Sequence, residues 1–356
     1  MALSIGIVGL PNVGKSTLFN VLTQNKSAEA SNYPFCTIDP NVGIVKVPDE
    51  RLEKIASISN PTKIIPTTIE FVDIAGLVSG ASKGEGLGNK FLSHIRECDA
   101  ICEVVREFKD GNIIHVNGKI DPDGDKETIN LELILADLAT VTKSLDKVAK
   151  DAKSGNKESV ALRDLLTRVK EGLENEKAVR DIDMSTEEKL SIKSLSLLTA
   201  KPIVYALNTK DISKDLTELK AKWGDDIIAL DAKMEEEIAS MDPGDQKEYI
   251  EELGLDSSGL DKLIKASYKL LGLSTYFTTG KEETRAWTYK NGFKAPQAAG
   301  VIHTDFEKGF IRAEIIKYND FIENNGEANC REKGLIKTEG KDYVMQDGDI
   351  CHFLFN

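Results

Sequence analysis

Short, predominantly apolar segments recur along the first two thirds of the chain, at residues 4–8, 69–72, 101–105, 203–207 and 227–230. Strands of a parallel sheet are buried on both faces, so they have apolar runs of this kind rather than alternating patterns. The first run ends in a glycine-rich turn, and residues 15–23 follow it with apolar side chains at helical spacing. The pattern predicts a doubly wound α/β sheet that begins as strand, loop and helix.

A helical pattern from about residue 127 to 198 interrupts these runs between the third and the fourth. Its apolar positions step by four and three, the spacing of a coiled-coil seam, on both sides of a break at residues 154–156. These positions are Leu131, Leu135, Leu138, Thr142, Leu145, Ala149 and Ala152, then Leu162, Leu166, Val169 and Leu173. We expect an antiparallel helical hairpin whose outer face is either solvated or binds a partner. Ser185 and Glu188 form a capping box, which predicts a further helix to about Leu198.

Aromatic residues gather among threonines and glycines after about Leu273, as in a small mixed β domain. The chain is therefore expected to have three parts. Residues 1–126 and 199–275 form the α/β domain, residues 127–198 the helical insertion and residues 276–356 the C-terminal β domain.

Composition narrows the class of protein without identifying it. The chain has 356 residues, of which 40% are hydrophobic and 29% charged, as in ordinary soluble proteins. No apolar run approaches the roughly 20 residues needed to cross a bilayer, and the first residues lack the pattern of a secretory signal. We expect a cytoplasmic protein with no membrane partner and with reduced cysteines. The net charge of -13 argues against a protein that wraps nucleic acid, but it leaves a local RNA contact open.

The glycine-rich turn from Gly9 to Ser16 matches GxxxxGK[ST] at every fixed position and lies between the predicted strand and helix. Glycines allow backbone N–H groups to close around phosphate oxygens, and the helix N-terminus favours the negative charge. We predict nucleotide contacts from Asn12, Val13, Gly14, Lys15, Ser16 and Thr17. Lys15 is expected to reach the terminal phosphates in catalysis, and the Ser16 hydroxyl to bind Mg²⁺.

Two further segments complete the expected phosphate and metal site. Asp73 and Gly76 form a DxxG motif after the second apolar run, where the carboxylate can hold Mg²⁺ through water and the glycine N–H can approach the γ-phosphate. Thr37 lies between the first helix and the next strand, the place of a switch threonine that closes on the metal. We therefore predict Ser16, Thr37 and Asp73 as metal ligands and Gly76 as a catalytic residue.

The base is expected to bind after the two last apolar runs. Asn208 and Asp211 occupy the place of the NKxD motif of GTPases, although Thr209 replaces the lysine whose stem normally lies along the base. Ala232 stands where such proteins place a second base-contacting loop. Asp211 alone favours guanine, because a carboxylate can accept both the N1–H and the exocyclic amine. The missing lysine stem weakens that readout, so we predict that both nucleotides bind with ATP favoured and with Asn208 at the purine N7 edge.

Long strings of the sequence resemble those of the YchF family, the Obg-like ATPases within the translation-factor class of P-loop proteins. They are GLPNVGKST at 9–17, YPFCTI at 33–38, DIAGLV at 73–78, GASKGEGLGN at 80–89, APQAAG at 295–300 and HTDFEKGF at 303–310. The resemblance implies a P-loop G domain, a helical coiled-coil insertion and a C-terminal TGS domain of ubiquitin-like β-grasp type. It also implies slow hydrolysis of ATP, sometimes also of GTP, with Mg²⁺. The implied partner is the ribosome, with the large subunit as the expected contact and RNA within reach of the TGS domain or the helical arm.

The residue after DxxG is Leu77, whereas Ras-like enzymes have a glutamine that orients the attacking water. A leucine cannot hydrogen-bond water, so another group must do so. In proteins similar to this one the candidate is a histidine, here His115. A loop histidine satisfied by the backbone is the alternative. The Asn12 carbonyl is a further candidate, for holding K⁺ beside the phosphates as in related potassium-stimulated hydrolases.

Three functions remain open at this point. The first is an ATPase switch that acts on the translation apparatus through the helical arm and the TGS domain. The second is a GTP-specific GTPase of the same architecture, which Asp211 supports. The third is a nucleotide-regulated binding module, such as a chaperone or a stress-signalling adaptor.

Overall fold

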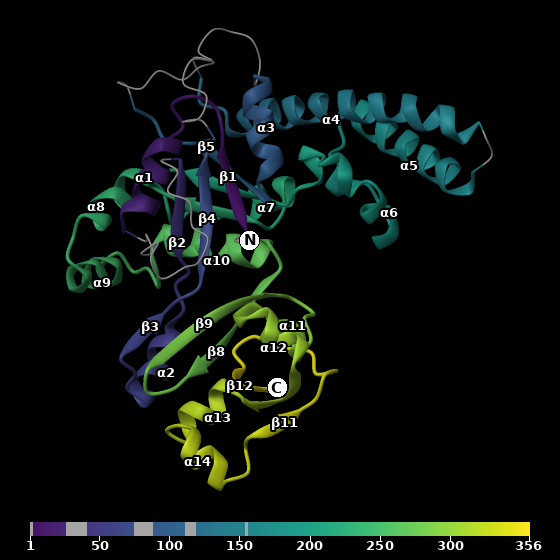
Figure 1. Cartoon of the computed structure of the whole chain (residues 1–356). Helices are drawn as coiled ribbons and strands as arrows, with labels where there is room; N and C mark the ends of the chain where they lie inside the picture. Colours follow the sequence, from purple (N-terminus) through teal and green to yellow (C-terminus); the bar gives the residue numbers. More distant parts are fainter. Residues whose placement is uncertain (1–2, 26–40, 75–87, 111–118, 154–155) are drawn as a thin grey trace.

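The computed structural model describes residues 3–25, 41–74, 88–110, 119–153 and 156–356 (Figure 1). The strands are β1 (Ser4–Val8), β2 (Val42–Lys46), β3 (Lys63–Ile65), β4 (Thr68–Asp73), β5 (Ala100–Arg106), β6 (Ile203–Asn208), β7 (Ile227–Leu230), β8 (Leu273–Thr279), β9 (Glu283–Lys290), β10 (Phe310–Ile316), β11 (Lys337–Glu339) and β12 (Ile350–Phe355). The α-helices before β8 are α1 (Lys15–Asn25), α2 (Glu50–Ser59), α3 (Asn89–Glu97), α4 (Pro122–Ala152), α5 (Lys157–Glu174), α6 (Thr186–Ser191), α7 (Thr217–Trp223), α8 (Ala232–Ala239), α9 (Pro243–Glu252) and α10 (Gly259–Leu270). Those after it are α11 (Ala295–Ile302), α12 (Thr304–Lys308), α13 (Tyr318–Glu323) and α14 (Glu327–Glu332).

The first sheet has the strand order β2-β4-β1-β5-β6-β7, with only β2 antiparallel to its neighbour among the strands that the structure describes. Each of the five apolar runs forms one of its strands, so the predicted doubly wound sheet is confirmed. Helices α1 and α10 cover one face through side chains such as Leu18 and Leu263, and α3 with the start of α4 covers the other through Ile95 and Ile129. Both faces are thus buried, which explains why these strands are predominantly apolar rather than alternating.

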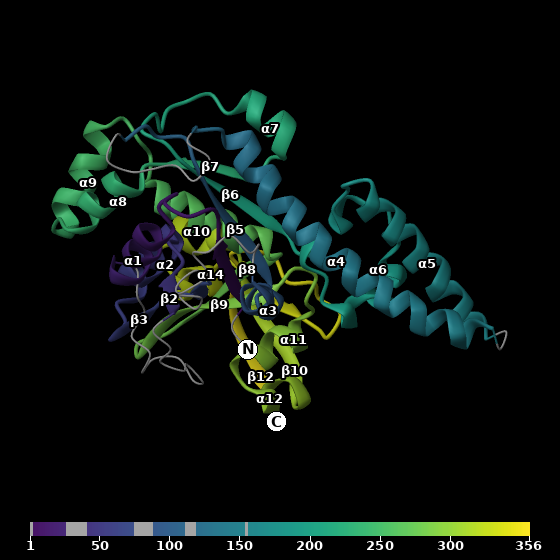
Figure 2. The same ribbon diagram turned by 90° about the horizontal axis from the view of Figure 1, so that it is seen from above.

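Helices α4 and α5 form the predicted hairpin, which projects from the side of the first sheet (Figure 2). The seam expected on α4 is wrong at its start, because Leu131 and Leu135 are 41% and 52% exposed. Instead Ile129 and Leu133 pack on the sheet, while Ile134 and Val141 enter the hairpin core. The first turns of α4 must bury a face against the sheet, and that contact sets the rotation of the helix. The seam expected on α5 is confirmed, with its leucines and valine facing α4.

The capping box before α6 is present, since Ser185 Oγ accepts from Glu188 N (3.2 Å) and the Glu188 carboxylate accepts from Ser185 N (2.8 Å). The helix ends at Ser191, however, and does not reach Leu198 as expected. The buried Asp137 carboxylate accepts hydrogen bonds from Leu198 N (2.8 Å) and Thr199 N (2.7 Å). Ser196 also has a left-handed φ of 47°, which an α-helix excludes, so the chain leaves the helix before Leu198 and turns back to the sheet.

The second sheet has the order β11-β10-β12-β8-β9-β3 and forms the C-terminal domain together with one segment from the middle of the first domain. Strand β3, which lies between β2 and β4 in the sequence, pairs in parallel with β9. Helix α2 packs beside it, with Leu52 and Ile55 in a core that includes Phe277. The boundary expected after residue 275 falls inside β8, and the one expected after residue 126 falls inside α4.

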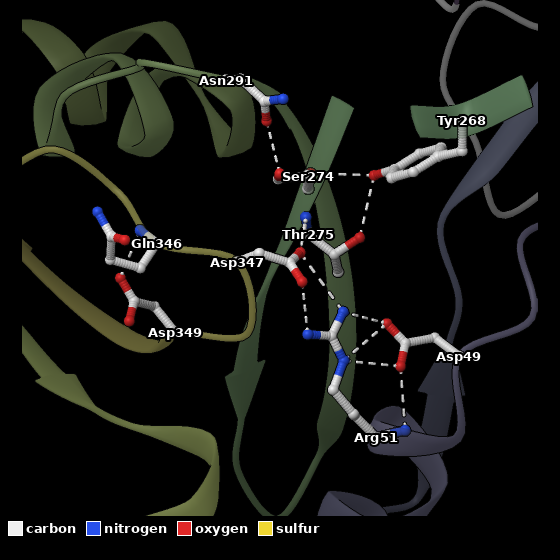
Figure 3. A network of polar contacts seen from close by, with 9 residues as sticks. All are labelled: Asp49, Arg51, Tyr268, Ser274, Thr275, Asn291, Gln346, Asp347 and Asp349. Atoms are coloured by element: carbon white, nitrogen blue, oxygen red, sulfur yellow. Dashed lines mark hydrogen bonds and ion pairs between the residues drawn. The ribbon is translucent and has the colours of Figure 1, made fainter. Parts of the chain in front are cut away.

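Arg51 of α2 fixes this segment to the C-terminal domain (Figure 3). Its guanidinium donates hydrogen bonds to both carboxylate oxygens of Asp49 (2.9 and 2.8 Å) and to Asp347 (2.7 Å). Asp347 also accepts from Thr275 N (2.9 Å), at the start of β8. A strand pair, an apolar core and a charged network thus join residues 49–65 to the second sheet.

Cys98, Cys102, Cys330 and Cys351 are free and buried, as expected for reduced thiols. Within the described ranges, none of the helices has both the length and the apolar character required to span a membrane.

Candidate functional site: a nucleotide pocket at the P-loop

The loop between β1 and α1 has a backbone that only certain residues can adopt. Gly9 and Gly14 have φ values of 145° and 103°, and Asn12 has a φ of 62°. A Cβ on Gly9 would lie 2.4 Å from the Val104 carbonyl oxygen, and one on Gly14 would lie 2.4 Å from Asn208 Nδ2. The two glycines of the motif are therefore required both by their φ values and by close neighbours.

Three carbonyl groups of this loop accept hydrogen bonds from side chains. Leu10 O accepts from Lys15 Nζ (2.6 Å), Asn12 O from Arg106 Nη1 (3.4 Å) and Val13 O from Asn208 Nδ2 (2.9 Å). The peptide bonds are trans, so the N–H groups of Val13 and Gly14 point away from the bound carbonyls of Asn12 and Val13, whereas Pro11 after Leu10 has no N–H. The N–H groups of Val13 and Gly14 are thereby held in fixed directions, as a cradle for an anion requires.

A pocket of 490 Å³ opens beside this loop and extends to the ends of β6 and β7. It is lined by Asn12, Gly14, Lys15, Ser16, Thr17, Phe108, Asp110, Asn208, Lys210, Asp231, Ala232, Lys233 and Glu236. Seven of the nine residues predicted to bind nucleotide line it. Val13 contributes only its backbone, since its side chain is buried in the core. The ninth residue, Asp211, is considered below.

Lys15 stands at the phosphate end of the pocket and is only 9% exposed. Burial lowers the pKa of its ammonium group to about 8, and the charge of nearby Asp73 opposes that shift. A cation held with so little water interacts strongly with an anion. The position therefore suits the contact with terminal phosphates that the motif predicts.

The oxygen donors predicted for Mg²⁺ that the structure describes, Ser16 and Asp73, lie on two neighbouring elements. Ser16 is exposed in the first turn of α1 and lines the pocket, and Asp73 ends β4, the strand next to β1. Mg²⁺ usually takes one or two protein oxygens together with substrate phosphates and water, and a hydroxyl with a carboxylate fits this pattern. Thr37, Gly76 and His115 lie outside the described residues.

Asn208 connects the P-loop to the loop after β7. Its Nδ2 donates to Val13 O, and its Oδ1 accepts from Ala232 N (3.1 Å), while the side chain is only 4% exposed. The Ala232 N–H is thus bound to Asn208. The expected contact of Asn208 with the purine N7 stays a prediction, but the structure gives this residue a second role that the sequence did not reveal.

The residues after Asn208 are not arranged as expected for a site that binds the base. Asp211 is exposed and is not among the residues that line the pocket. Its carboxylate accepts from Ser213 Oγ (3.1 Å) and its N–H donates to Thr209 Oγ1 (3.2 Å), a local turn of the kind that aspartate and threonine favour. Lys210 lines the pocket instead, so the expectation that this pocket lacks a lysine stem is wrong. A guanine contact by Asp211 stays a prediction that this geometry does not favour.

Arg106, the last residue of β5, and Phe108, two residues beyond it, are site residues that sequence reasoning missed. Arg106 is 1% exposed and its guanidinium lies 4.3 Å from the centre of the Phe108 ring, which lines the pocket. A K⁺ ion at the Asn12 carbonyl would lie next to this guanidinium, so the expected cation site at that oxygen is disfavoured. The only hint in the sequence was an arginine at the end of a predominantly apolar run.

The strand, P-loop and helix, together with the loops that meet at this pocket, define a P-loop nucleoside triphosphate hydrolase. Residues 4–209 match the family model MMR_HSR1, described as "50S ribosome-binding GTPase", and residues 273–356 match YchF-GTPase_C, described as "Protein of unknown function (DUF933)". With the full-length similarities given next, these matches show that the chain belongs to the YchF family.

The chain is similar to "Ribosome-binding ATPase YchF" of Bacillus subtilis, with 55% identity over 367 aligned positions that cover 100% of both chains. The protein of the same name from Escherichia coli O157:H7 is 52% identical, again over 100% of both chains. The solved structure of the Schizosaccharomyces pombe YchF GTPase matches with a TM-score of 0.90 and 41% identity, over 99% of this chain and 97% of that one. The predicted family and the predicted fold class are confirmed.

Proposed function

We propose that this chain binds and hydrolyses ATP with Mg²⁺ in the pocket beside Lys15, as a switch that associates with ribosomes. The observation that carries the proposal is the P-loop, in which Arg106 and Asn208 hold the carbonyls of Asn12 and Val13 so that the next two amides can bind phosphate. The names of the bacterial relatives, "Ribosome-binding ATPase", support the nucleotide and the partner.

In this proposal Ser16, Thr37 and Asp73 hold Mg²⁺, which supplies charge neutralisation at the phosphates when bound. Lys15 and the N–H of Gly76 bind the γ-phosphate, and His115 orients the attacking water, since Leu77 cannot. The principal test is His115→Ala. We expect slower hydrolysis with nearly unchanged affinity for ATP, because a water-positioning group acts mainly in the transition state. A joint loss of rate and affinity would mean that His115 is structural. Replacing Na⁺ by K⁺ in the same assay tests the expected monovalent cation.

The base end of the pocket argues against strong selection of guanine, and the name of the bacterial relatives supports ATP. Phe108 and the stem of Lys210 offer surfaces on which either purine can stack, whereas Asp211 is hydrogen-bonded away from the pocket. The names of the relatives differ on the nucleotide, because the yeast protein is called a GTPase. A GTP-specific enzyme is therefore the second candidate, and titration of both nucleotides decides between them.

The ribosome, with the large subunit as the expected site, and a cytoplasmic location complete the proposal. The hairpin α4–α5 and the C-terminal domain are the surfaces that extend away from the pocket (Figures 1 and 2). RNA contact through either surface belongs to the same proposal. Co-sedimentation with ribosomes and with isolated subunits, in ATP, ADP and no nucleotide, tests it. Binding that does not depend on nucleotide would argue against a switch and favour an adaptor.

A further inference from the structure

We infer that Arg106 is a positioning residue for the nucleotide: it fixes the Asn12–Val13 peptide of the P-loop and, through Phe108, the wall of the base pocket. This inference rests on the proposed nucleotide site. Arg106 is the last residue of β5 and ranks among the largest fully buried side chains of the described chain. A buried guanidinium costs free energy unless its donors find acceptors, so its contacts are informative about its role.

The first contact is with the P-loop. Arg106 Nη1 donates to the carbonyl of Asn12 (3.4 Å), a residue with a φ of 62° that non-glycine residues rarely adopt. The peptide that follows is trans, so a carbonyl held toward Arg106 turns the Val13 N–H to the opposite side. Without the guanidinium, this peptide loses one of the contacts that fix its direction, and the Val13 N–H is held less firmly in place for a phosphate oxygen.

The second contact is with the base end. Arg106 Nε donates to the carbonyl of Phe108 (3.2 Å), and the guanidinium plane covers one face of the Phe108 ring at 4.3 Å. That ring lines the same pocket as the P-loop. One side chain therefore bridges the phosphate end and the aromatic wall. A lysine could keep the charge, but it has neither the fork that reaches two carbonyls nor the flat group that covers the ring.

If Arg106 positions the P-loop, its replacement should weaken nucleotide binding more than it slows hydrolysis. P-loop amides hold the phosphates both before and during the reaction, so their misplacement raises Kd and KM more than it lowers kcat. For Arg106→Met in the full-length protein we expect Kd values for ATP and for ADP that are about tenfold higher, the change that about 1.4 kcal/mol produces. Arg106→Lys should restore the affinity only in part, with a Kd at least about threefold above that of the parent protein.

Arg180→Met is the matched control. Arg180 is a half-buried arginine that also donates to a backbone carbonyl, that of Thr199 (3.2 Å), and to Asn130 (3.2 Å) at the root of the arm. Its loss should lower the melting temperature without changing the Kd for ATP. All affinities are measured calorimetrically well below each melting temperature.

Unchanged ATP and ADP affinity in Arg106→Met would overturn the inference. If that variant does not fold, Arg106→Lys decides, and parental affinity in Arg106→Lys would equally overturn it. Lys15→Ala distinguishes failure of the inference about Arg106 from failure of the proposed nucleotide site. If Lys15→Ala also binds ATP normally, the pocket itself is misassigned. If the Arg106 variants bind ATP normally but Lys15→Ala does not, the nucleotide site is correct and Arg106 has no positioning role.

Discussion

The two ends of the nucleotide pocket are built in different ways. At the phosphate end, Lys15, Arg106 and Asn208 are buried and each donates to a carbonyl of the same loop. At the base end, Arg106 covers Phe108, but the charged side chains of Asp110, Lys210, Lys233 and Glu236 are exposed. The first end is fixed before any ligand arrives, whereas the second can adjust its side chains to the ligand.

This difference has an energetic consequence. Removal of a buried partner leaves the remaining group without its hydrogen bond and without water, which typically costs about 1 to 3 kcal/mol. Exposed charged groups are screened by solvent and typically contribute about 0 to 1 kcal/mol. Substitutions at the phosphate end should therefore change affinity strongly for any nucleotide, and those at the base end should change it weakly and with a dependence on the base.

Lys15→Ala should have the largest effect, a rise in the Kd for ATP of at least about 100-fold, or about 2.7 kcal/mol. It removes a cation that water does not screen and that the phosphate charge would otherwise meet directly. Calorimetric titration of ATP measures it. Lys210→Ala is the control, since this lysine lines the same pocket but is exposed. Equal losses in the two variants would break the contrast between the two ends.

Asn208→Ala should raise the Kd values for ATP and GTP together, by about 10- to 30-fold, which corresponds to about 1.4 to 2 kcal/mol. The substitution leaves Val13 O and Ala232 N, both in buried surroundings, without their partner. The same titrations with both nucleotides check it. A loss confined to one nucleotide would instead show that the Asn208 amide reads the base.

The affinity for ATP should fall as the pH rises from 7.5 to 9. With the pKa of Lys15 lowered to about 8 by burial, the free protein loses this positive charge within that range, while bound phosphate favours the charged form. The Kd should therefore increase about eightfold. Lys15→Arg keeps its charge and should bind with little dependence on pH. A flat profile for the parent protein would show that Lys15 remains charged throughout.

The phosphate end was predictable from sequence because its geometry is built into the motif spacing. The glycines, Lys15 and Ser16 must follow a strand and begin a helix, and both elements are evident from short-range patterns. The contact of Arg106 with the P-loop was not predictable, because Asn12 meets it only after β1 and β5 are placed side by side. The same reason applies to β3, which has three residues and pairs with β9 far along the chain.

Local patterns also failed where two surfaces compete for one helix. The spacing of Leu131 and Leu135 fits a coiled-coil seam. Ile129 and Leu133 pack against the sheet instead, and this leaves Leu131 and Leu135 exposed. At the base end, the position of Asp211 in the sequence indicated a guanine contact. A short turn with Thr209 and Ser213 decides where its carboxylate lies, and motif spacing does not encode that turn.

The smallest effect is expected for Asp211→Ala, which should change the ratio of ATP to GTP affinity by less than about threefold, or about 0.7 kcal/mol. To accept the N1–H and the amine of guanine, the carboxylate must leave Ser213 Oγ and enter a pocket that it does not line. Asp211 and Ser213 are both exposed, so the carboxylate would replace one weak, solvated hydrogen bond with hydrogen bonds to guanine. The net gain in affinity for GTP over ATP should therefore be small. Ser213→Ala sharpens the test, since it releases the carboxylate and should raise only the affinity for GTP. A strong GTP preference in the parent protein that disappears in Asp211→Ala would show that this aspartate reads guanine, and that the base end is as fixed as the phosphate end.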